Sequence, residues 1–197
     1  MLEIIVLMYI ASWISFIAGY IFLKSGSSSA RKLEKFTWNS RIKKFQERPF
    51  NKIIDAFEEK NFLLALVCVI GINFNMVIFQ ALTGFILLSP IVVIFQAFLM
   101  GILIAQADRK TTVFSLFVLI FELGAFSTSG AIGLHIGIEW IFTNVSFVDS
   151  FKDMIAKGYY LIPVICLLLN GLFEASGVFF GIKGVPGAKA VKEQLYK

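Results

Sequence analysis

The chain has 197 residues, of which 58% are hydrophobic and only 16% are charged. Soluble globular domains are about half apolar and about a quarter charged, so this composition excludes an ordinary soluble protein. It favours a single integral membrane domain over residues 1–197. The formal net charge is +5, and in a membrane protein the position of that charge matters, because Lys and Arg gather on the cytoplasmic side.

The first apolar run covers residues 4–23. At a helical rise of about 1.5 Å per residue, a run of this length matches a hydrocarbon core about 30 Å thick. It lacks the basic start of a signal peptide and is longer than the apolar core of one. The run therefore predicts a retained membrane-spanning helix.

Residues 24–60 carry 10 Lys or Arg and 5 Asp or Glu. Apolar side chains recur among them at steps near three or four, interrupted by Pro49. This pattern is typical of a basic amphipathic helix lying on the membrane surface. A solvated cytoplasmic loop would carry the same charge, and that alternative stays open.

Four further apolar runs follow. Residues 62–106 contain no charged residue, a length that predicts two spans, 62–82 and 84–106, joined by a turn at Thr83-Gly84. A fourth span is predicted over 111–138, broken at 127–130, and a fifth over 159–181. The expected fold is an all-α, polytopic transmembrane helical bundle of about five spans, with an interfacial helix between spans 1 and 2.

The basic residues favour one orientation of these spans. The segments 24–60, 107–110 and 183–197 fall on one side of a five-span bundle and hold 16 Lys or Arg, whereas Lys152 and Lys157 fall on the other side. The positive-inside rule then places the N-terminus outside and the basic tail, 183–197, in the cytoplasm. The expected location is the cytoplasmic membrane.

Polar side chains recur at similar depth within the spans. Four spans each carry an amide or carboxylate 13 residues from a cytoplasmic Lys or Arg, which is about 20 Å at helical rise. Glu174 shares a helix face with Asn170. Two carboxyls this close in a dry bundle do not both ionise without a proton, a cation or a donor. The predicted intramembrane polar cluster comprises Asn73, Asn75, Gln96, Glu122, Asn170 and Glu174.

Two interpretations of this cluster stay open. In the structural one, buried hydrogen bonds tie the helices together, at about 0.6 kcal/mol each in membranes. In the functional one, the cluster is a cation or proton site, a peptide contact or a catalytic carboxylate pair. The pairs Gly133-xxx-Gly137 and Gly177-xxx-Gly181 predict close helix packing, either within the chain or between two copies.

Catalytic, metal and cofactor signatures are absent from the sequence. It has no GxSxG, no Walker lysine loop and no HExxH. Cys68 and Cys166 lie in apolar runs without a CxxC spacing, and His135 is the only histidine. We therefore predict no catalytic residue, no metal, no cofactor and no nucleic-acid partner.

Three stretches resemble the stage II sporulation protein M family of polytopic membrane proteins. They are Asn73-Phe-Asn75 with Gly84, the Glu122 stretch 121–125 with the glycines of 129–137, and Leu172-Phe-Glu174-Ala175. Together they cover roughly residues 61–181. The family usually has Pro-His-Gly before the first Glu, where this chain reads Phe117-Val-Leu119, so a role that needs that histidine is not expected here.

The resemblance implies a membrane component of an assembly that handles a peptide, protein or cell-envelope substrate, in envelope remodelling or in bacteriocin maturation, export and immunity. It implies as partners other membrane proteins such as an ABC transporter. The apolar spans predict the lipid bilayer as a further partner, and the glycine pairs leave a second copy of the chain open. Two alternatives come from Glu122 and Glu174 themselves: a cation- or proton-coupled transporter, or an intramembrane enzyme that acts on a peptide through the two carboxylates.

Overall fold

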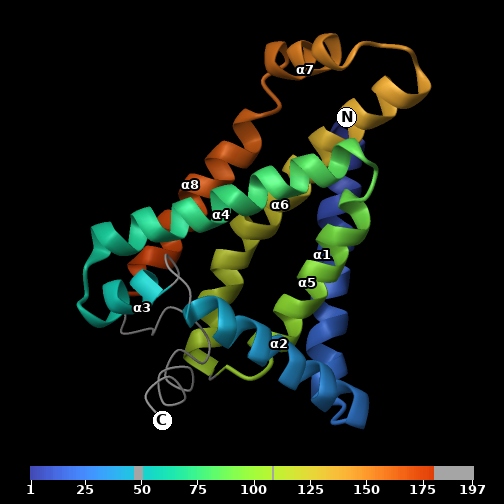
Figure 1. Cartoon of the computed structure of the whole chain (residues 1–197). Coiled ribbons are helices and arrows are strands. Elements are labelled where there is room, and N and C mark those ends of the chain that lie inside the picture. The colour runs from blue at the N-terminus through green and yellow to red at the C-terminus, as the bar shows by residue number, and fades with distance from the viewer. Residues whose placement is uncertain (47–50, 108, 180–197) are drawn as a thin grey trace.

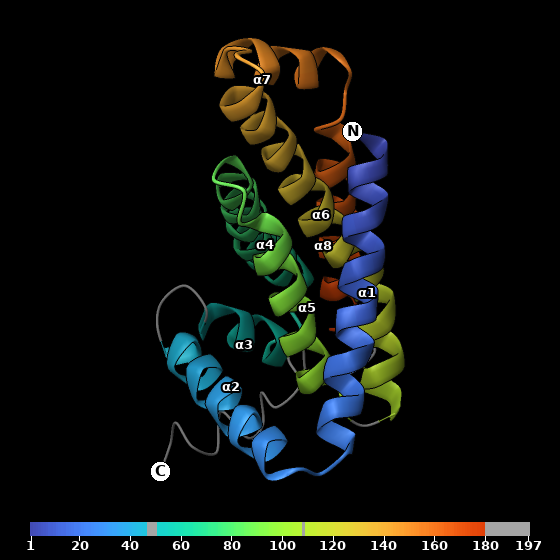
Figure 2. The ribbon, with the colours of Figure 1, turned by 90° about the vertical axis from the view of Figure 1, so that its right-hand side faces the viewer.

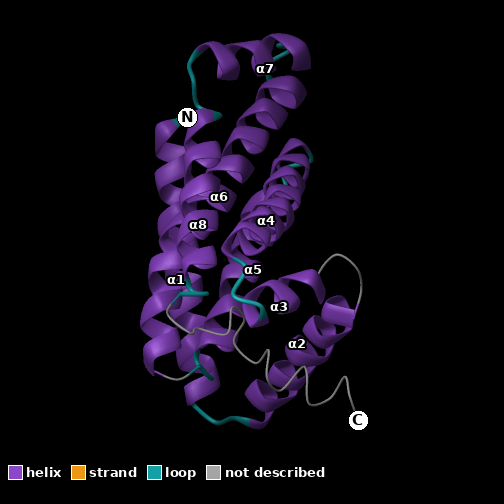
Figure 3. Ribbon diagram, turned by 90° about the vertical axis from the view of Figure 1, so that its left-hand side faces the viewer, coloured by secondary structure: helices purple, strands orange, loops and turns teal. Residues whose placement is uncertain are grey.

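The computed structural model describes residues 1–46, 51–107 and 109–179, and within them the chain is helical, without strands. Short loops and turns join the helices (Figure 3). The prediction of an all-α fold is confirmed. The described helices are α1 (Leu2–Lys24), α2 (Ser28–Gln46), α3 (Asn51–Glu58), α4 (Phe62–Phe85), α5 (Ser89–Ile104), α6 (Arg109–Phe142), α7 (Phe147–Ala156) and α8 (Leu161–Ser176).

Helices α1, α5, α6 and α8 run between two ends of the bundle, and α4 lies obliquely across α6 and α8 (Figures 1 and 2). Helix α7 and the N-terminus lie at one end, here called the α7 end, whereas α2 and α3 lie at the other, the α2 end. Helix α6 is central, since it contacts α1, α4, α5 and α8. Helix α1 packs mainly on α5, and α4 packs on both α6 and α8.

Several helices are long and apolar enough to cross a membrane. Among the described residues these are α1, α4 and Thr111–Phe142 of α6; α7 and α8 pass the same test as a pair bent by 63°, and α5 is a shorter apolar helix. Large apolar side chains such as Leu7, Ile14 and Leu63 are exposed on the outside of the bundle. A water-soluble bundle presents polar residues on that face, so the surface is consistent with a membrane protein.

Glycines bring two pairs of helices into backbone contact. A Cβ at Gly133 would overlap the backbone of Ala81, and one at Gly137 would meet the carbonyl oxygen of Phe85. The pair Gly133-xxx-Gly137 therefore packs α6 against α4 within the chain. Gly19 packs in the same way against Phe98, which joins α1 to α5. Gly177 lies against the ring of Phe114, and Gly181 falls outside the described residues.

The helix bounds differ from the predicted spans chiefly at two predicted breaks. Helix α6 also continues to Phe142, past the predicted 138, and α8 ends at Ser176, before the predicted 181. Helix α4 continues through Thr83-Gly84 to Phe85, and the chain turns at 86–88, where Leu87 has a φ of 61°. Gly84 is needed inside the helix because its Cα lies against the backbone of Gly130 and Leu134. Helix α6 is likewise unbroken at 127–130, because those small residues face neighbouring helices.

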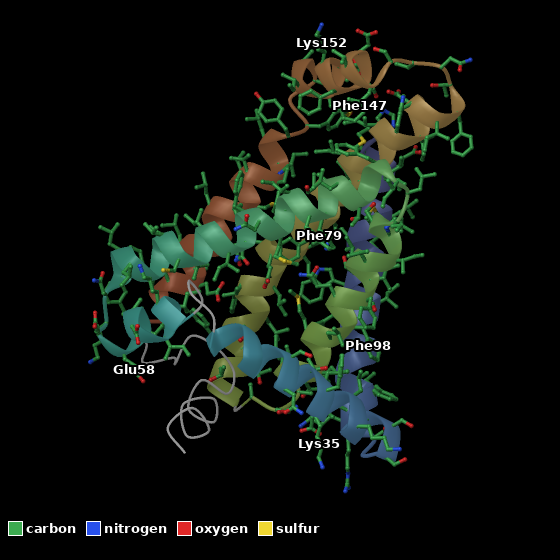
Figure 4. The ribbon with its side chains drawn as sticks, in the orientation of Figure 1. Lys35, Glu58, Phe79, Phe98, Phe147 and Lys152 are labelled. Atoms are coloured by element: carbon green, nitrogen blue, oxygen red, sulfur yellow. The ribbon has the colours of Figure 1, made fainter. Side chains whose placement is uncertain are left out.

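The two ends of the bundle carry different side chains. Lys35 and Glu58 lie at the α2 end, and Lys152 lies on α7 at the opposite end (Figure 4). Helix α3 rests on α4, with Ile53 and Ala56 buried. The predicted interfacial segment is thus helical in its described part. Pro49 and the basic tail, 183–197, lie outside the residues that the structure describes.

Candidate functional site

The rings of Phe121 on α6 and Phe173 on α8 are stacked, with centroids 5.3 Å apart and planes at 12°. Gly124 lies against the sulfur of Cys166, on the α7 side of this stack, and Gly177 lies against Phe114 on the other side. Residues later in α6 therefore contact residues earlier in α8. The two helices are antiparallel, with Glu122 and Asn170 at about the same level.

Asn170 faces into the bundle. Its neighbours on the helix surface are Cys166, one turn before, and Phe173, one turn after, and both contact α6. The Asn170 side chain is therefore on the face of α8 that packs on α6. Only 1% of the residue is exposed, and neither Oδ1 nor Nδ2 has a hydrogen-bond partner among the described residues.

The two carboxylates are on α6 and α8, near the level of this amide. Glu122 is two turns before Ser129 on α6, and the Ser129 hydroxyl donates to the Val77 carbonyl oxygen of α4 at 2.6 Å. Because residues seven apart share a helix face, Glu122 is directed towards α4. Glu174 follows Asn170 by one turn and lies nearer the α2 end. Both glutamates are partly buried.

Asn73 completes the group from α4. It is 8% exposed and lies one turn before Val77, on the side that meets α6. Helix α8 also packs on α4, because Gly171 lies against the side chain of Ile70. Helices α4, α6 and α8 pack on one another, and each carries a polar side chain on or near its packed face. We call this contact the α4/α6/α8 crease and define it by Asn73, Glu122, Asn170 and Glu174.

Two residues of the predicted cluster lie elsewhere. Gln96 on α5 accepts a 2.6 Å hydrogen bond from Nε2 of Gln80 on α4, so it belongs to the α4–α5 contact. Asn75 is exposed and donates to the carbonyl oxygen of Gly71 in its own helix at 2.9 Å. Counting residues fixes a position along a helix, but not the direction of a side chain around it.

Serine hydroxyls form the interhelical hydrogen bonds that the sequence did not assign. The hydroxyls of Ser12 and Ser127 are 2.9 Å apart and join α1 to α6. Ser89 donates to the carbonyl oxygen of Gly130 at 2.9 Å and joins α5 to α6. These buried serines lie near glycines that pack the same helices together. A serine near such glycines was the feature of the sequence that could have predicted these hydrogen bonds.

A second polar group joins α6 to α7. His135 Nε2 lies 3.2 Å from Glu139 Oε1, one turn along α6. The Ser150 hydroxyl of α7 donates to the other oxygen of Glu139. Ser150 is buried, so this contact holds α7 across the end of the bundle. His135 thus lies beside the Glu139 carboxylate at the α7 end.

The chemistry of the crease follows from its atoms. A buried amide with no partner costs about 1–3 kcal/mol per unsatisfied group, which a polar ligand would recover. Carboxylate and amide oxygens accept hydrogen bonds from N–H and O–H donors. Within the described residues no group of three or more His, Cys, Asp or Glu is arranged to hold a metal ion. The crease is therefore suited to a polar donor group.

No family model, no curated protein and no solved structure matches this chain. The fold and the site define its class: an all-α protein of apolar helices, consistent with a membrane protein, with a polar crease buried between three of the helices.

Proposed function

We propose that this chain is a multi-pass membrane component of an assembly that handles a peptide, protein or cell-envelope substrate, and that it is related to the stage II sporulation protein M family. The observation that carries the proposal is the buried side chain of Asn170. It has no hydrogen-bond partner among the described residues and lies at the level of Glu122 on the facing helix.

The helices that form the crease are already held together by other contacts. Gly133 and Ala81 bring α6 and α4 into backbone contact, and Gly171 packs α8 on Ile70 of α4. Ser129 adds the hydrogen bond between α6 and α4. A residue retained only to tie helices would make such a bond, and Asn170 makes none. The crease is better explained as a place where something else binds.

The membrane placement is part of the same proposal. Helices α1, α4, α5, α6 and α8 cross the cytoplasmic membrane, with the N-terminus outside and the basic tail in the cytoplasm. Helices α2 and α3 then lie at the cytoplasmic surface, where the exposed Arg31, Lys32 and Lys35 meet anionic headgroups. The proposed partners are the bilayer, other membrane proteins such as an ABC transporter, and a second copy.

Affinity isolation of the tagged chain from its native membranes, in a mild detergent, tests this proposal. We expect other membrane proteins to co-isolate in constant ratio to the chain. A matched isolation with the tag on an unrelated multi-pass protein gives the background. Recovery of this chain alone, above that background, would contradict an assembly role.

A transporter is the second candidate, supported by the two carboxylates of the crease. Intramembrane acids that face a bundle interior often mark cation or proton paths. Flux into proteoliposomes should then depend on Glu122 and Glu174. If flux is absent, or if it is unchanged in a Glu122→Gln/Glu174→Gln double variant of equal abundance, the transporter is rejected.

A further inference from the structure

We propose that α7 and the last turn of α6 form a lipid-binding surface that holds the α7 end in the headgroup region of the outer leaflet. The inference rests on the membrane placement in the proposed function, which puts the α7 end outside the cell. It adds a bilayer contact that the spanning helices do not supply, because α7 lies across the end of the bundle (Figures 1 and 2).

Helix α7 has three faces, which lie about a third of a turn apart. Ser150 and Met154 are buried on the bundle side, where the Ser150 hydroxyl donates to Glu139 of α6. The second face is apolar and 45–55% exposed, and it comprises Val148, Phe151 and Ile155. The third face is charged, and it comprises Asp149, Lys152 and Asp153. The helix therefore presents an apolar face that the rest of the described chain leaves open.

The apolar face of α7 is directed sideways, along the membrane surface. The ring of Phe147, at the start of α7, packs on Phe85 at the end of α4, with centroids 5.1 Å apart. Lys152 points away from the bundle (Figure 4). Around the helix, the apolar face lies between the directions of these two side chains. Helix α7 thus has the placement of an interfacial helix, with one flank towards lipid and its charges towards water.

Aromatic rings extend this face onto α6. The ring of Phe147 lies parallel to that of Phe151, with 6.4 Å between centroids, and edge-on to that of Trp140, at 6.3 Å. Trp140 and Phe142 are more than half exposed. Tryptophan is enriched at membrane–water interfaces, where its ring sits at the level of the headgroups. We call this surface the α6/α7 patch and define it by Trp140, Phe142, Phe147, Val148, Phe151 and Ile155.

The charges beside the patch favour a lipid partner and not a charged protein. The two Asp and two Lys of α7 and its C-cap balance, and Lys157 Nζ lies 2.7 Å from Asp153 Oδ2. A balanced face exerts little long-range attraction on an acidic or a basic partner. A protein that approached from outside would also meet the charged face before the patch, whereas the bilayer reaches the patch from the side. The α2 end differs, because its exposed lysines and arginine suit anionic headgroups.

Spin labels on single cysteines test the inference in the full chain. In the chain without its native cysteines, the substitutions are Val148→Cys and Ile155→Cys in the patch, Lys152→Cys on the charged face, and Ile14→Cys on α1 as the control for a spanning helix. Each variant is labelled and reconstituted into phosphatidylcholine nanodiscs. Collision rates with oxygen, which dissolves in hydrocarbon, and with a water-soluble nickel chelate report what surrounds each label.

We expect the ratio of oxygen to chelate collisions at positions 148 and 155 to lie between a high ratio at 14 and a low ratio at 152, and to stay unchanged when anionic lipid is added. A ratio at 148 and 155 as low as that at 152 would overturn the inference, because the patch would then lie in water. Loss of both collision rates at 148 and 155 would also overturn it, because a protein surface would then cover the patch. A high ratio at position 14 confines either failure to α7, whereas a low ratio there would reject the membrane placement itself.

Discussion

The ring of Phe121 on α6 lies flat against the ring of Phe173 on α8, with 5.3 Å between centroids. Phe121 and Phe173 each immediately precede a glutamate in the sequence. This one contact therefore sets the positions of Glu122 and Glu174 along the α6–α8 interface. Small residues on either side of the stack, Gly124 and Gly177, let the two helices approach. The aromatic pair therefore fixes the register of the proposed site.

The stack should be measurable as a coupling energy. Phe121→Ala and Phe173→Ala each remove one ring, and the double variant removes both. We expect an interaction free energy of about 0.5–1.5 kcal/mol from the double-mutant cycle of unfolding in detergent. Additive effects of the two substitutions would show that the rings do not stabilise the α6–α8 contact.

Close packing of α4 on α6 predicts a strong position effect for glycine. Gly133→Ala places a methyl group into the backbone of Ala81, so the helices must separate, and we expect a loss of about 1–3 kcal/mol in the free energy of unfolding. Gly71→Ala on α4 is the control, because a Cβ there meets nothing. It should be neutral or slightly stabilising, since Ala favours helix. Equal losses at both positions would refute the packing account.

Removing a buried amide and removing a buried hydroxyl should change stability in opposite directions. Ser129→Ala deletes the hydrogen bond to Val77 and should lower the free energy of unfolding by about 0.6 kcal/mol. Asn170→Leu deletes a group with no partner among the described residues, so the unliganded chain should gain about 1–3 kcal/mol. Reversible unfolding in mixed micelles measures both. Destabilisation by Asn170→Leu would mean that the amide ties the helices.

The helices were predictable from composition and length, but their ends were not. Thr83-Gly84 favoured a turn, since glycine is a common turn residue. The structure instead uses Gly84 to bring α4 onto α6 and turns at Leu87, which has a positive φ. The same reasoning failed at 127–130. A small residue in an apolar run either marks a turn or allows a neighbouring helix to pack closely. The sequence of the run alone does not show which of the two applies.

The candidate site was partly predictable for a related reason. Counting residues from the cytoplasmic charges predicted one depth for the polar side chains, and two of them, Asn73 and Asn170, are buried on the packed faces of α4 and α8. The count carried no information on rotation about the helix axis. That is why Asn75, which bonds to Gly71 in its own helix, and Gln96, which pairs with Gln80, were grouped with the others.

The proposed topology predicts opposite labelling at the two ends of the bundle. In a chain without its native cysteines, single cysteines would replace Lys35 on α2 and Lys152 on α7, which lie at opposite ends (Figure 4). A membrane-impermeant maleimide should label position 152 in intact cells and position 35 only after permeabilisation. Labelling of both positions from the same side would contradict the five-span arrangement.

Photo-crosslinking in native membranes tests the central claim, that the crease receives a substrate or a partner. A photoreactive phenylalanine analogue would replace Phe173, which is 41% exposed and adjoins Glu174, or Phe79, which is 47% exposed on α4 and serves as the control. The account predicts a protein or peptide adduct at position 173 that is lost in the Glu122→Gln/Glu174→Gln variant, and lipid adducts alone at position 79. Lipid adducts alone at both positions would contradict it.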